Sequence, residues 1–540
     1  MNIKNFLEKG FLISPDAIKI LKDEENNNIQ HINKKILKEN LVVLNKDIFN
    51  ILNNGRDIIS INWREFERSK TLVEKGKNNK IYHTFLDLLN YEEKKEKLNK
   101  ILEEVQKPEQ IKNISIEKPL ITPSVVVLKS YNKEPKKREV GHFVKHFKVR
   151  YDKIKKILLI HQSVQDIISI GKTKLKQEKE QTSIIGLVEN KVITKNGNVI
   201  LTIEDPTGQI KVLISKNKGD LFETSKDIVL DEVICIKGVM GKDILFAQKI
   251  TFPGIPLNRE LKKSPDEIYA LFISDIHVGS KSFLQSSFLK FVNWLNGEEG
   301  DERIREIGKK VKYIFIPGDL VAGVGVYPGQ EVDLDIPNIK EQYESLSNYL
   351  SKIPKDISII IAPGNHDATR LAEPQPTLDK DLAKSLWDMQ NVIMVSSPSL
   401  VNIHSSENFP GFDVYMYHGS SYHYYKSNVE KLRLNKAHEN PTIVSEFLLQ
   451  KRHIAPTHEA TVYIPDDEED PLIIDKIPDI FVTGDHHHSA NSMFNNINII
   501  SCSCFQKKTE YEEKRGYEPD PGMVPVLNLK TREVETINFA

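Results

Sequence analysis

Residues 268–280 read IYALFISDIHVGS, an apolar run that ends on Asp275 and His277. A short apolar run that ends in polar residues is typical of a strand buried on both faces. The same pattern recurs in VKYIFIPGD, ISIIIAPGN, DVYMYHG and DIFVTGD, and INIISCS adds one more apolar run. Because ligands gather at the carboxyl ends of strands in α/β sheets, residues 265–540 are predicted to form an α/β domain with its site at these ends.

The polar residues at the strand ends are candidate metal ligands. Asp275 and His277, at positions i and i+2, can point to one side and bind a single ion. Glycine with Asp or Asn after one strand is usually a turn, but five such clusters in one domain favour a metal site. The candidates are Asp275, His277, Asp319, Asn365, His418 and a pair from the cluster Gly484-Asp485-His486-His487-His488.

The mixture of Asp, Asn and His without Cys suits Mn²⁺, Zn²⁺ or Fe, and about seven such groups are what two adjacent ions need. Two ions roughly 3.5–4 Å apart would clamp a phosphate and generate a bridging hydroxide that attacks phosphorus in line. The carboxylate of Asp319 has oxygens enough to bridge both ions. His366, which follows the candidate ligand Asn365, is the candidate general acid for the leaving oxygen.

Upstream of this domain, residues 181–255 change to short β-rich runs. Asn196-Gly197 joins two of them and predicts a hairpin, and the turn residues 205–208 lead to a third strand. A helical piece near Leu221 and two further strands follow. Five strands with a helix between the third and fourth predict an OB-fold barrel, a module that often binds oligonucleotides.

The remaining chain is expected to be largely helical. Residues 1–55 place apolar side chains at helical spacing and predict a helical module, residues 56–120 predict a charged linker, and residues 121–180 predict a connecting helical region. Its basic and aromatic run at 136–156 could bind phosphates and stack on bases. Because Phe143, Phe147 and Tyr151 recur every four residues, we interpret them instead as one helix face packed on a core.

Composition limits the function classes. Lys and Arg number 75 and Asp and Glu 76, so the net charge is −1 and any contact with nucleic acid must use local patches or partners. Three cysteines cannot form a disulfide framework, which favours a reducing compartment, and we expect a cytoplasmic protein. The sequence shows no signal segment and no run of about 18 apolar residues, so no contact with a membrane is expected. Cys502 and Cys504 are expected to be buried thiols, and the acidic run Asp466–Asp470 a solvated loop.

The series Asp-x-His, Gly-Asp, Gly-Asn-His-Asp, His-Gly and a late Gly-plus-His cluster resembles the calcineurin-like metallophosphoesterases, which include the nuclease of the double-strand-break repair complex. The chain is more closely similar to the small subunits of archaeal family D DNA polymerases. That resemblance covers most of the chain and is weakest before residue 120. The phrases that carry it are LFISDIHVGS (271–280), GDLVAGVGVYPGQ (318–330), APGNHDATR (362–370), LLQKRHIAPTHEA (448–460), DPLIIDKIPDIF (470–481) and PGMVPVLNL (521–529).

The resemblance implies an α/β multidomain protein with a small helical N-terminal module, an OB-fold barrel and a calcineurin-like α/β sandwich phosphoesterase domain. It implies a 3′→5′ exonuclease that proofreads for a separate large polymerase subunit. Asp275 and His277 would hold one divalent ion, Asp319 would bridge, and Asn365 and His418 would hold the other. His366 would protonate the leaving 3′ oxygen. Mn²⁺ is the first choice of metal, with Zn²⁺, Fe or Mg²⁺ as alternatives.

One motif departs from the family pattern. The family's last cluster reads Gly-His-x-His, whereas this chain has Asp485 where the first of these histidines stands. Aligned without a gap, Asp485 and His487 would be the ligands; with one inserted residue, His486 and His488 would be. We favour the ungapped pair, because a strand-end turn tolerates a change of ligand more easily than a shift of register.

Three functions follow from these observations. The first is a two-metal exonuclease that acts on DNA, and the second is a non-catalytic scaffold that binds the large polymerase subunit, motivated by the altered histidine cluster. The third, a phosphatase for proteins or small phosphomonoesters, fits the metal motifs alone and does not explain the barrel. The sequence has no phosphate-binding loop of the Gly-x-x-x-x-Gly-Lys-Ser/Thr type, so nucleotide polymerisation is assigned to the partner.

Overall fold

The computed structural model describes residues 12–13, 43–44, 124–134 and 136–540. Near the N-terminus, β1 (Leu12–Ile13) pairs in parallel with β2 (Val43–Leu44). These four residues are therefore extended, where a helical module was expected over 1–55. The rest of that module and the whole linker 56–120 lie outside the described residues, and the two regions remain predictions.

Residues 121–180 contain the expected helices and one strand. The strand β3 (Val125–Ser130) pairs with a strand of the C-terminal sheets, a long-range pairing that the sequence did not predict. In α8 (Val140–Leu158), Tyr151 and Ile154 are buried and Phe143 and Phe147 are half-buried, which confirms that the aromatic residues lie on the face packed against the protein. A short helix, α9 (Ile170–Thr173), follows.

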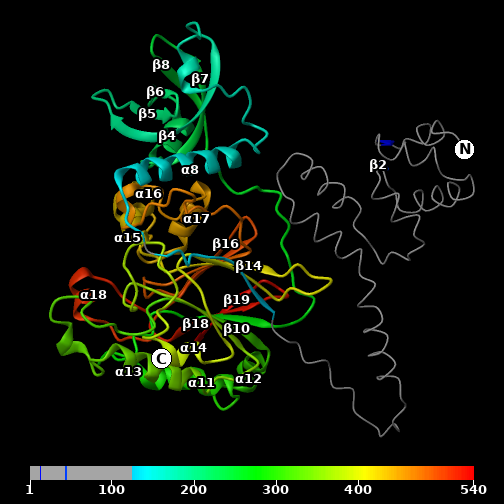
Figure 1. Cartoon of the computed structure of the whole chain (residues 1–540), viewed down its shortest axis with the longest axis vertical. Helices are drawn as coiled ribbons and strands as arrows, with labels where there is room; N and C mark the ends of the chain where they lie inside the picture. The colour runs from blue at the N-terminus through cyan, green and yellow to red at the C-terminus, as the bar shows by residue number, and fades with distance from the viewer. Residues whose placement is uncertain (1–11, 14–42, 45–123, 135) are drawn as a thin grey trace, which may run out of the picture. The chain divides into compact units, whose positions relative to one another are not determined.

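The predicted five-stranded barrel is confirmed. Its strands close in the order β4-β5-β6-β8-β7, and α10 lies between the third and fourth strands of the sequence. The five labelled strands lie together in Figure 1. Gly197 in the predicted hairpin has a φ of 79°, a conformation that favours glycine. The elements are β4 (Gln181–Ile193), β5 (Val199–Asp205), β6 (Gly208–Ile214), α10 (Gly219–Lys226), β7 (Val233–Met240) and β8 (Ile244–Thr251).

Two six-stranded sheets form the C-terminal region. The first has the order β12-β11-β10-β9-β18-β19, and β12, β11, β10 and β9 are mutually parallel. The second has the order β16-β17-β15-β14-β13-β3, with β17, β15 and β14 parallel. The first sheet comprises β9 (Tyr269–Phe272), β10 (Val311–Pro317), β11 (Ser358–Ala362), β12 (Val392–Met394), β18 (Met523–Asn528) and β19 (Val534–Asn538). The second adds β13 (Ser399–Ile403), β14 (Phe412–Tyr417), β15 (Ile480–Thr483), β16 (Ala490–Phe494) and β17 (Ile497–Ser501) to β3.

The two sheets pack face to face with helices outside. One buried apolar cluster joins Phe272 and Phe315 of the first sheet to Met416 and Val482 of the second. Separate clusters cover the outer face of each sheet, so the region has four layers: helix, sheet, sheet and helix. The helices on the first sheet are α11 (Gln285–Leu295), α12 (Glu302–Lys309), α13 (Ile339–Leu350) and α14 (Lys384–Trp387). Those on the second are α15 (Tyr422–Asn428), α16 (Glu430–Leu434) and α17 (Thr442–Lys451). Three further helices are η1 (Gln330–Asp333), η2 (His458–Ala460) and α18 (Glu510–Arg515).

The acidic run Asp466–Asp470 is only in part the solvated loop that the sequence indicated: Glu468 is exposed, but the two ends of the run are not. Asp466 and Asp470 are fully buried. The Nε of Arg150 in α8 donates to Oδ2 of Asp470 at 2.7 Å, and His453 Nε2 lies 2.9 Å from the same oxygen. The prediction was wrong for the two ends of the run, because Lys133 pairs with Asp466, and Arg150 and His453 pair with Asp470, in place of water. Within the described ranges, the structure contains no helix long and apolar enough to cross a bilayer.

Candidate metal centre

The loops that follow five strands converge on one site. In the first sheet, β9 is followed by Asp275 and His277, β10 by Asp319, and β11 by Asn365 and His366. In the second sheet, the parallel strands β14 and β15 are followed by His418 and by the cluster that begins at Asp485. Because these strands end at the same edge, side chains up to 210 residues apart come into contact.

One group of side chains surrounds His277. Its Nε2 lies 3.3 Å from Nε2 of His487 and 3.9 Å from Oδ2 of Asp319. The Nε2 of His487 is also 3.4 Å from Oδ1 of Asp275. Two imidazole nitrogens and two carboxylates therefore face one small volume, in which Asp275 and His277 are almost wholly shielded from solvent.

A second group surrounds His418. Its Nε2 lies 2.7 Å from Oδ1 of Asn365, 3.4 Å from Oδ1 of Asp319 and 3.7 Å from Oδ1 of Asp485. Asp319 thus turns Oδ2 toward the first group and Oδ1 toward the second. The structure places a single carboxylate between the two groups, where the sequence predicted a bridging residue.

The late histidine cluster divides between the inside and the outside of the site. Asp485 faces His418 and His487 faces His277, as in the ungapped register. His486 instead accepts a hydrogen bond from Lys426 at 2.9 Å and stacks on Tyr422. The Nδ1 of His488 lies 3.7 Å from Asp520, on the other side of the loop. Of the alternative pair, His486 lies near Asp485 alone, with its Nδ1 3.8 Å from Oδ2, on the side of that carboxylate where His423 also lies, and His488 is paired with Asp520.

The backbone of this site is strained at the candidate ligands. Asp275, His277, Asp319, Asp485 and His487 all have φ between 49° and 68°, in the left-handed region that side chains other than glycine rarely adopt. Such strain persists where the surrounding structure enforces it, and it concentrates at functional sites. The pairs 275/277 and 485/487 share this backbone conformation, and His486 and His488 do not. Backbone conformation therefore distinguishes 485 and 487 from the alternative pair, as the direction of their side chains does.

Glycines allow the loops to approach closely. A Cβ on Gly364 would lie 2.5 Å from the backbone nitrogen of Asp319 and 2.7 Å from Cε1 of His418. A Cβ on Gly484 would lie 2.7 Å from Oδ2 of Asp275. These separations are too short for a carbon atom, so the glycine in each strand-end motif is required by packing against a candidate ligand.

The charge distribution suits a cation. Burial alone would raise the pKa of Asp319, but His418 and His366 outweigh it and hold that pKa below its usual range. Burial lowers the pKa of His277, so its ring is neutral and available as a ligand. Burial also lowers the pKa of His418, but Asp319, Asp485 and Asp275 outweigh this and raise it well above its ordinary value. His418 therefore lies in a strongly negative field.

The hydrogen bonds fix which ring nitrogens face the site. The Nδ1 of His418 donates to the carbonyl of Pro317 at 2.8 Å, so in the neutral ring the lone pair on Nε2 faces Asn365 Oδ1 and Asp319. The Nδ1 of His487 donates to Glu512 at 2.7 Å and leaves Nε2 facing His277. When the rings are neutral, lone pairs that converge in this way repel one another, and either a retained proton, as the raised pKa of His418 indicates, or a metal cation removes that repulsion. The residues present therefore fit divalent metal ions with N and O ligands.

Three functional contacts were not predicted from the sequence. They involve Glu512, which holds His487, and His423, whose Nε2 lies 2.9 Å from Oδ2 of Asp485. The third is the carbonyl of Ala322, 2.9 Å from Nδ1 of His366. The Thr509-x-x-Glu512 sequence does signal a helix start, and the capping box is present, but no sequence pattern shows which ligand the glutamate reaches.

A buried acid lies behind this centre. Glu373 is fully buried, and burial raises its pKa from 4.5 to about 7. Between these values the native state holds a proton that the unfolded chain has released, so stability falls as the pH rises through this window. We expect Glu373→Gln to remove most of this fall, about 2 kcal/mol between pH 5 and pH 8.

Urea unfolding at both pH values measures the effect, and Glu407→Gln, at an exposed position, serves as the control. An equal loss of stability with pH in Glu373→Gln and in the unmodified chain would contradict this role of Glu373.

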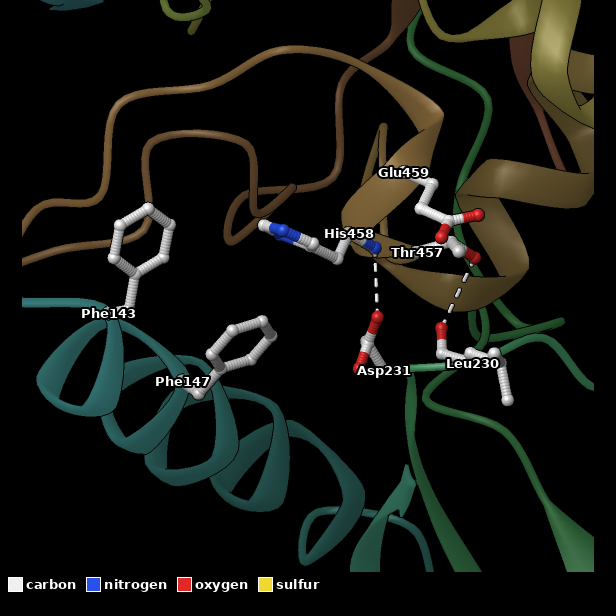
Figure 2. A pocket seen from close by; sticks show the side chains of 7 residues that line it. All are labelled: Phe143, Phe147, Leu230, Asp231, Thr457, His458 and Glu459. Atoms are coloured by element: carbon white, nitrogen blue, oxygen red, sulfur yellow. Dashed lines mark hydrogen bonds between the residues drawn. The ribbon is translucent and has the colours of Figure 1, made fainter. Parts of the chain in front are cut away.

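A separate pocket of about 530 Å³ contains none of the predicted site residues. Phe143 and Phe147 of α8 line it on one side, and His458 of η2 on the other (Figure 2). The backbone nitrogen of His458 donates to Asp231 at 2.8 Å, which connects η2 to the turn before β7. The aromatic residues of the basic run therefore line a pocket away from the strand ends as well as packing against the protein.

Comparisons with known proteins agree with this architecture. Residues 271–491 match the family model for the B subunits of DNA polymerases alpha and epsilon. The DNA polymerase II small subunit of Methanothermobacter thermautotrophicus is 36% identical over 403 residues, which cover 75% of this chain and 80% of that protein. The corresponding subunit of Pyrococcus furiosus is 39% identical over 390 residues, 72% of this chain and 62% of that protein, and that of Methanocaldococcus jannaschii is 36% identical over 392 residues, 72% and 64%. The chain thus spans less than two thirds of the last two relatives. The resemblance to archaeal family D small subunits is confirmed: this chain belongs to the family of DNA polymerase II small subunits.

Proposed function

We propose that this chain is the metal-dependent 3′→5′ exonuclease subunit of a replicative DNA polymerase. The observation that carries the proposal is the convergence of side chains from five strand ends into two groups on either side of Asp319. The four-layer arrangement of helices and sheets supports a calcineurin-like phosphoesterase domain. A proofreading phosphodiesterase needs both a metal centre and a route for DNA, and the barrel is a candidate for the latter.

The proposed ligands divide between two ions. Asp275, His277 and His487 would hold one, Asn365, His418 and Asp485 the other, and Asp319 would contact both. Mn²⁺ is the proposed metal. When bound, two such ions neutralise the charge of a phosphodiester and supply the nucleophile.

The chain's own contribution to the leaving group is assigned to His366. Its Nε2 lies 4.0 Å from Oδ2 of Asp319, and its backbone nitrogen donates to Oδ1 of the same residue at 2.8 Å. His366 is therefore held at the edge of the metal centre, with its ring close enough to His277 and Asp319 to share a cation with them. Its assignment as proton donor, in place of ligand, is part of the proposal. A proton on Nε2 can reach the 3′ oxygen as its bond to phosphorus breaks.

The proposed partners are a large polymerase subunit and DNA. The relatives are named small subunits, and the sequence assigns polymerisation to another chain. Because the net charge is only −1, DNA binding by the isolated chain is expected to be weak and to fall steeply with salt.

The test uses single-stranded DNA labelled at its 5′ end. With Mn²⁺, the full chain is expected to produce a ladder of products shortened one nucleotide at a time, and EDTA is expected to stop it. Products cut at internal positions would contradict an exonuclease. The alternative is a non-catalytic scaffold, and the specific observation in its favour is Asp485, which stands where the family has His. If neither Mn²⁺ nor Mg²⁺ supports cleavage, by the chain alone or with the large subunit, the scaffold function is favoured.

The support of His487 by Glu512 predicts a change in metal affinity. Glu512→Gln removes the carboxylate that accepts from Nδ1 of His487, and loss of such a support typically weakens metal binding by about 10–100-fold. Mn²⁺ binding followed by electron paramagnetic resonance measures the affinity directly. Glu513→Gln, one residue along the same helix and exposed, is the matched control. Equal Mn²⁺ affinities for the two variants would contradict this role of Glu512.

A further inference from the structure

We infer that two buried glutamines, Gln330 and Gln342, are positioning residues for His366, and that they act by fixing the peptide plane between Ala322 and Gly323. The inference deepens the proposed function and rests on it, because it assigns the residues that orient the proposed general acid. Gln330 begins η1 and Gln342 lies in the first turn of α13, and their side chains are 2% and 0% exposed.

The ring of His366 has one fixed partner. Its Nδ1 lies 2.9 Å from the carbonyl oxygen of Ala322, and a carbonyl can only accept, so Nδ1 carries a hydrogen. Nε2 is then the nitrogen that faces Asp319 Oδ2, at 4.0 Å. The orientation of a single backbone carbonyl thus decides which ring nitrogen is turned toward the reacting phosphate.

Both ends of that peptide plane are held by side chains. At the carbonyl end, Nε2 of Gln330 donates to the Ala322 oxygen at 2.8 Å. At the other end, the backbone nitrogen of Gly323 donates to Oε1 of Gln342 at 2.9 Å. An amide side chain suits each contact, since Gln330 must donate there and Gln342 must accept.

Both glutamines make further hydrogen bonds to the backbone of the same turn. Nε2 of Gln342 donates to the carbonyls of Gly323 at 3.1 Å and Ile336 at 2.7 Å, while Oε1 of Gln330 accepts from the nitrogen of Val326 at 2.9 Å. Gly323 has a φ of 73°, and a Cβ there would clash with the carbonyl of His366. The turn therefore has little freedom to tilt the Ala322 carbonyl unless a glutamine is lost.

A comparison of two substrates separates positioning from damage to the metal centre. DNA has a poor leaving group that requires a proton, whereas bis(p-nitrophenyl) phosphate releases a stable phenolate without one. Gln330→Met and Gln342→Met keep the approximate side-chain volume and remove the hydrogen bonds. With Mn²⁺, each is expected to lower kcat on DNA by about 10–100-fold and to leave the rate on bis(p-nitrophenyl) phosphate within about twofold.

Asn391→Leu is the matched control, because it removes a buried amide that donates to the carbonyl of Ile357 at 2.9 Å, away from the 322–323 peptide. It should leave both rates within about twofold of the unmodified chain. An equal loss of both rates in the glutamine variants, or no loss on DNA, would overturn the inference.

A spectroscopic measurement does not depend on turnover. The ¹⁵N shifts of the His366 ring, assigned by comparison with His366→Ala, should show hydrogen on Nδ1 in the metal-free chain. Gln330→Met should shift the ring toward a mixture of tautomers. Hydrogen on Nε2 in the unmodified chain, or an unchanged tautomer in Gln330→Met, would overturn the inference. Absence of cleavage by the unmodified chain on both substrates would instead overturn the proposed function, and the two failures are thereby distinguished.

Discussion

His487→Ala is expected to lower the rate of 3′ nucleotide release by about 10³-fold or more, whereas His488→Ala should leave it within about twofold. The two histidines are adjacent in sequence and differ in their surroundings. The Nε2 of His487 faces His277 and Asp275, while His488 lies beside Asp520. Loss of a metal ligand removes several kcal/mol of charge stabilisation in the transition state, and loss of a residue outside the site does not.

The measurement is the initial rate on labelled DNA across a range of Mn²⁺ concentrations. If a higher Mn²⁺ concentration restores part of the rate that His487→Ala has lost, the substitution has weakened metal binding. Thermal unfolding of both variants controls for loss of the fold. Inactivity of His488→Ala together with full activity of His487→Ala would contradict the ungapped register, in spite of the backbone conformation that residues 485 and 487 share with 275 and 277.

The second large effect is expected for His366→Ala, which should slow DNA hydrolysis by about 10²–10⁴-fold, the usual contribution of a general acid. The ring of His366 lies beside the proposed ligands His277 and Asp319. Because His366 is proposed as a proton donor and not as a ligand, Mn²⁺ affinity should stay within about threefold of the unmodified chain. Hydrolysis of bis(p-nitrophenyl) phosphate should change little, since its leaving group needs no proton.

The control for this experiment is Asp319→Asn, which removes a proposed ligand of both ions and should abolish the hydrolysis of both substrates. If His366→Ala lost Mn²⁺ binding, or lost the hydrolysis of both substrates to the same extent, this residue would be a ligand or a structural element. The assignment of His366 as proton donor would then be wrong.

Much of the centre could be predicted from local sequence, because each candidate ligand follows an apolar run by one to five residues. The length of an apolar run and the polar residues at its end are local properties, so Asp275, Asp319 and Asn365 could be assigned to strand ends. That these ends meet depends on the parallel order of β9, β10 and β11 and on the packing of the second sheet. The prediction relied on a general property of α/β sheets for that step.

The barrel could be predicted for a similar reason. Its Asn196-Gly197 hairpin and the helix between the third and fourth strands are signals within a few residues of chain. By contrast, the pairing of β3 with β13 joins residues about 270 positions apart, and the sequence of neither strand indicates which strand it pairs with. The burial of Asp470 by Arg150 is likewise non-local, which is why the acidic run was taken for a solvated loop.

The residues that orient the ligands are the ones that sequence reasoning missed. Glu512 accepts from His487, and Gln330 and Gln342 bond to the two ends of the 322–323 peptide. All three belong to elements that begin after the strand-end motifs. Their residue types are common on helix surfaces and carry no spacing that points to a metal. Only the three-dimensional structure shows which carbonyl or ring nitrogen each one holds.

Proofreading by this chain can be measured on a primer-template DNA with a single mispaired 3′ nucleotide, incubated with the full chain and Mn²⁺, beside the same chain carrying Asp319→Asn. We expect stepwise removal from the 3′ end by the unmodified chain, with faster loss of the mispaired than of the paired terminus, and no removal by the variant. Equal cleavage by both chains would contradict the exonuclease function, as would inactivity of the unmodified chain in complex with its large subunit.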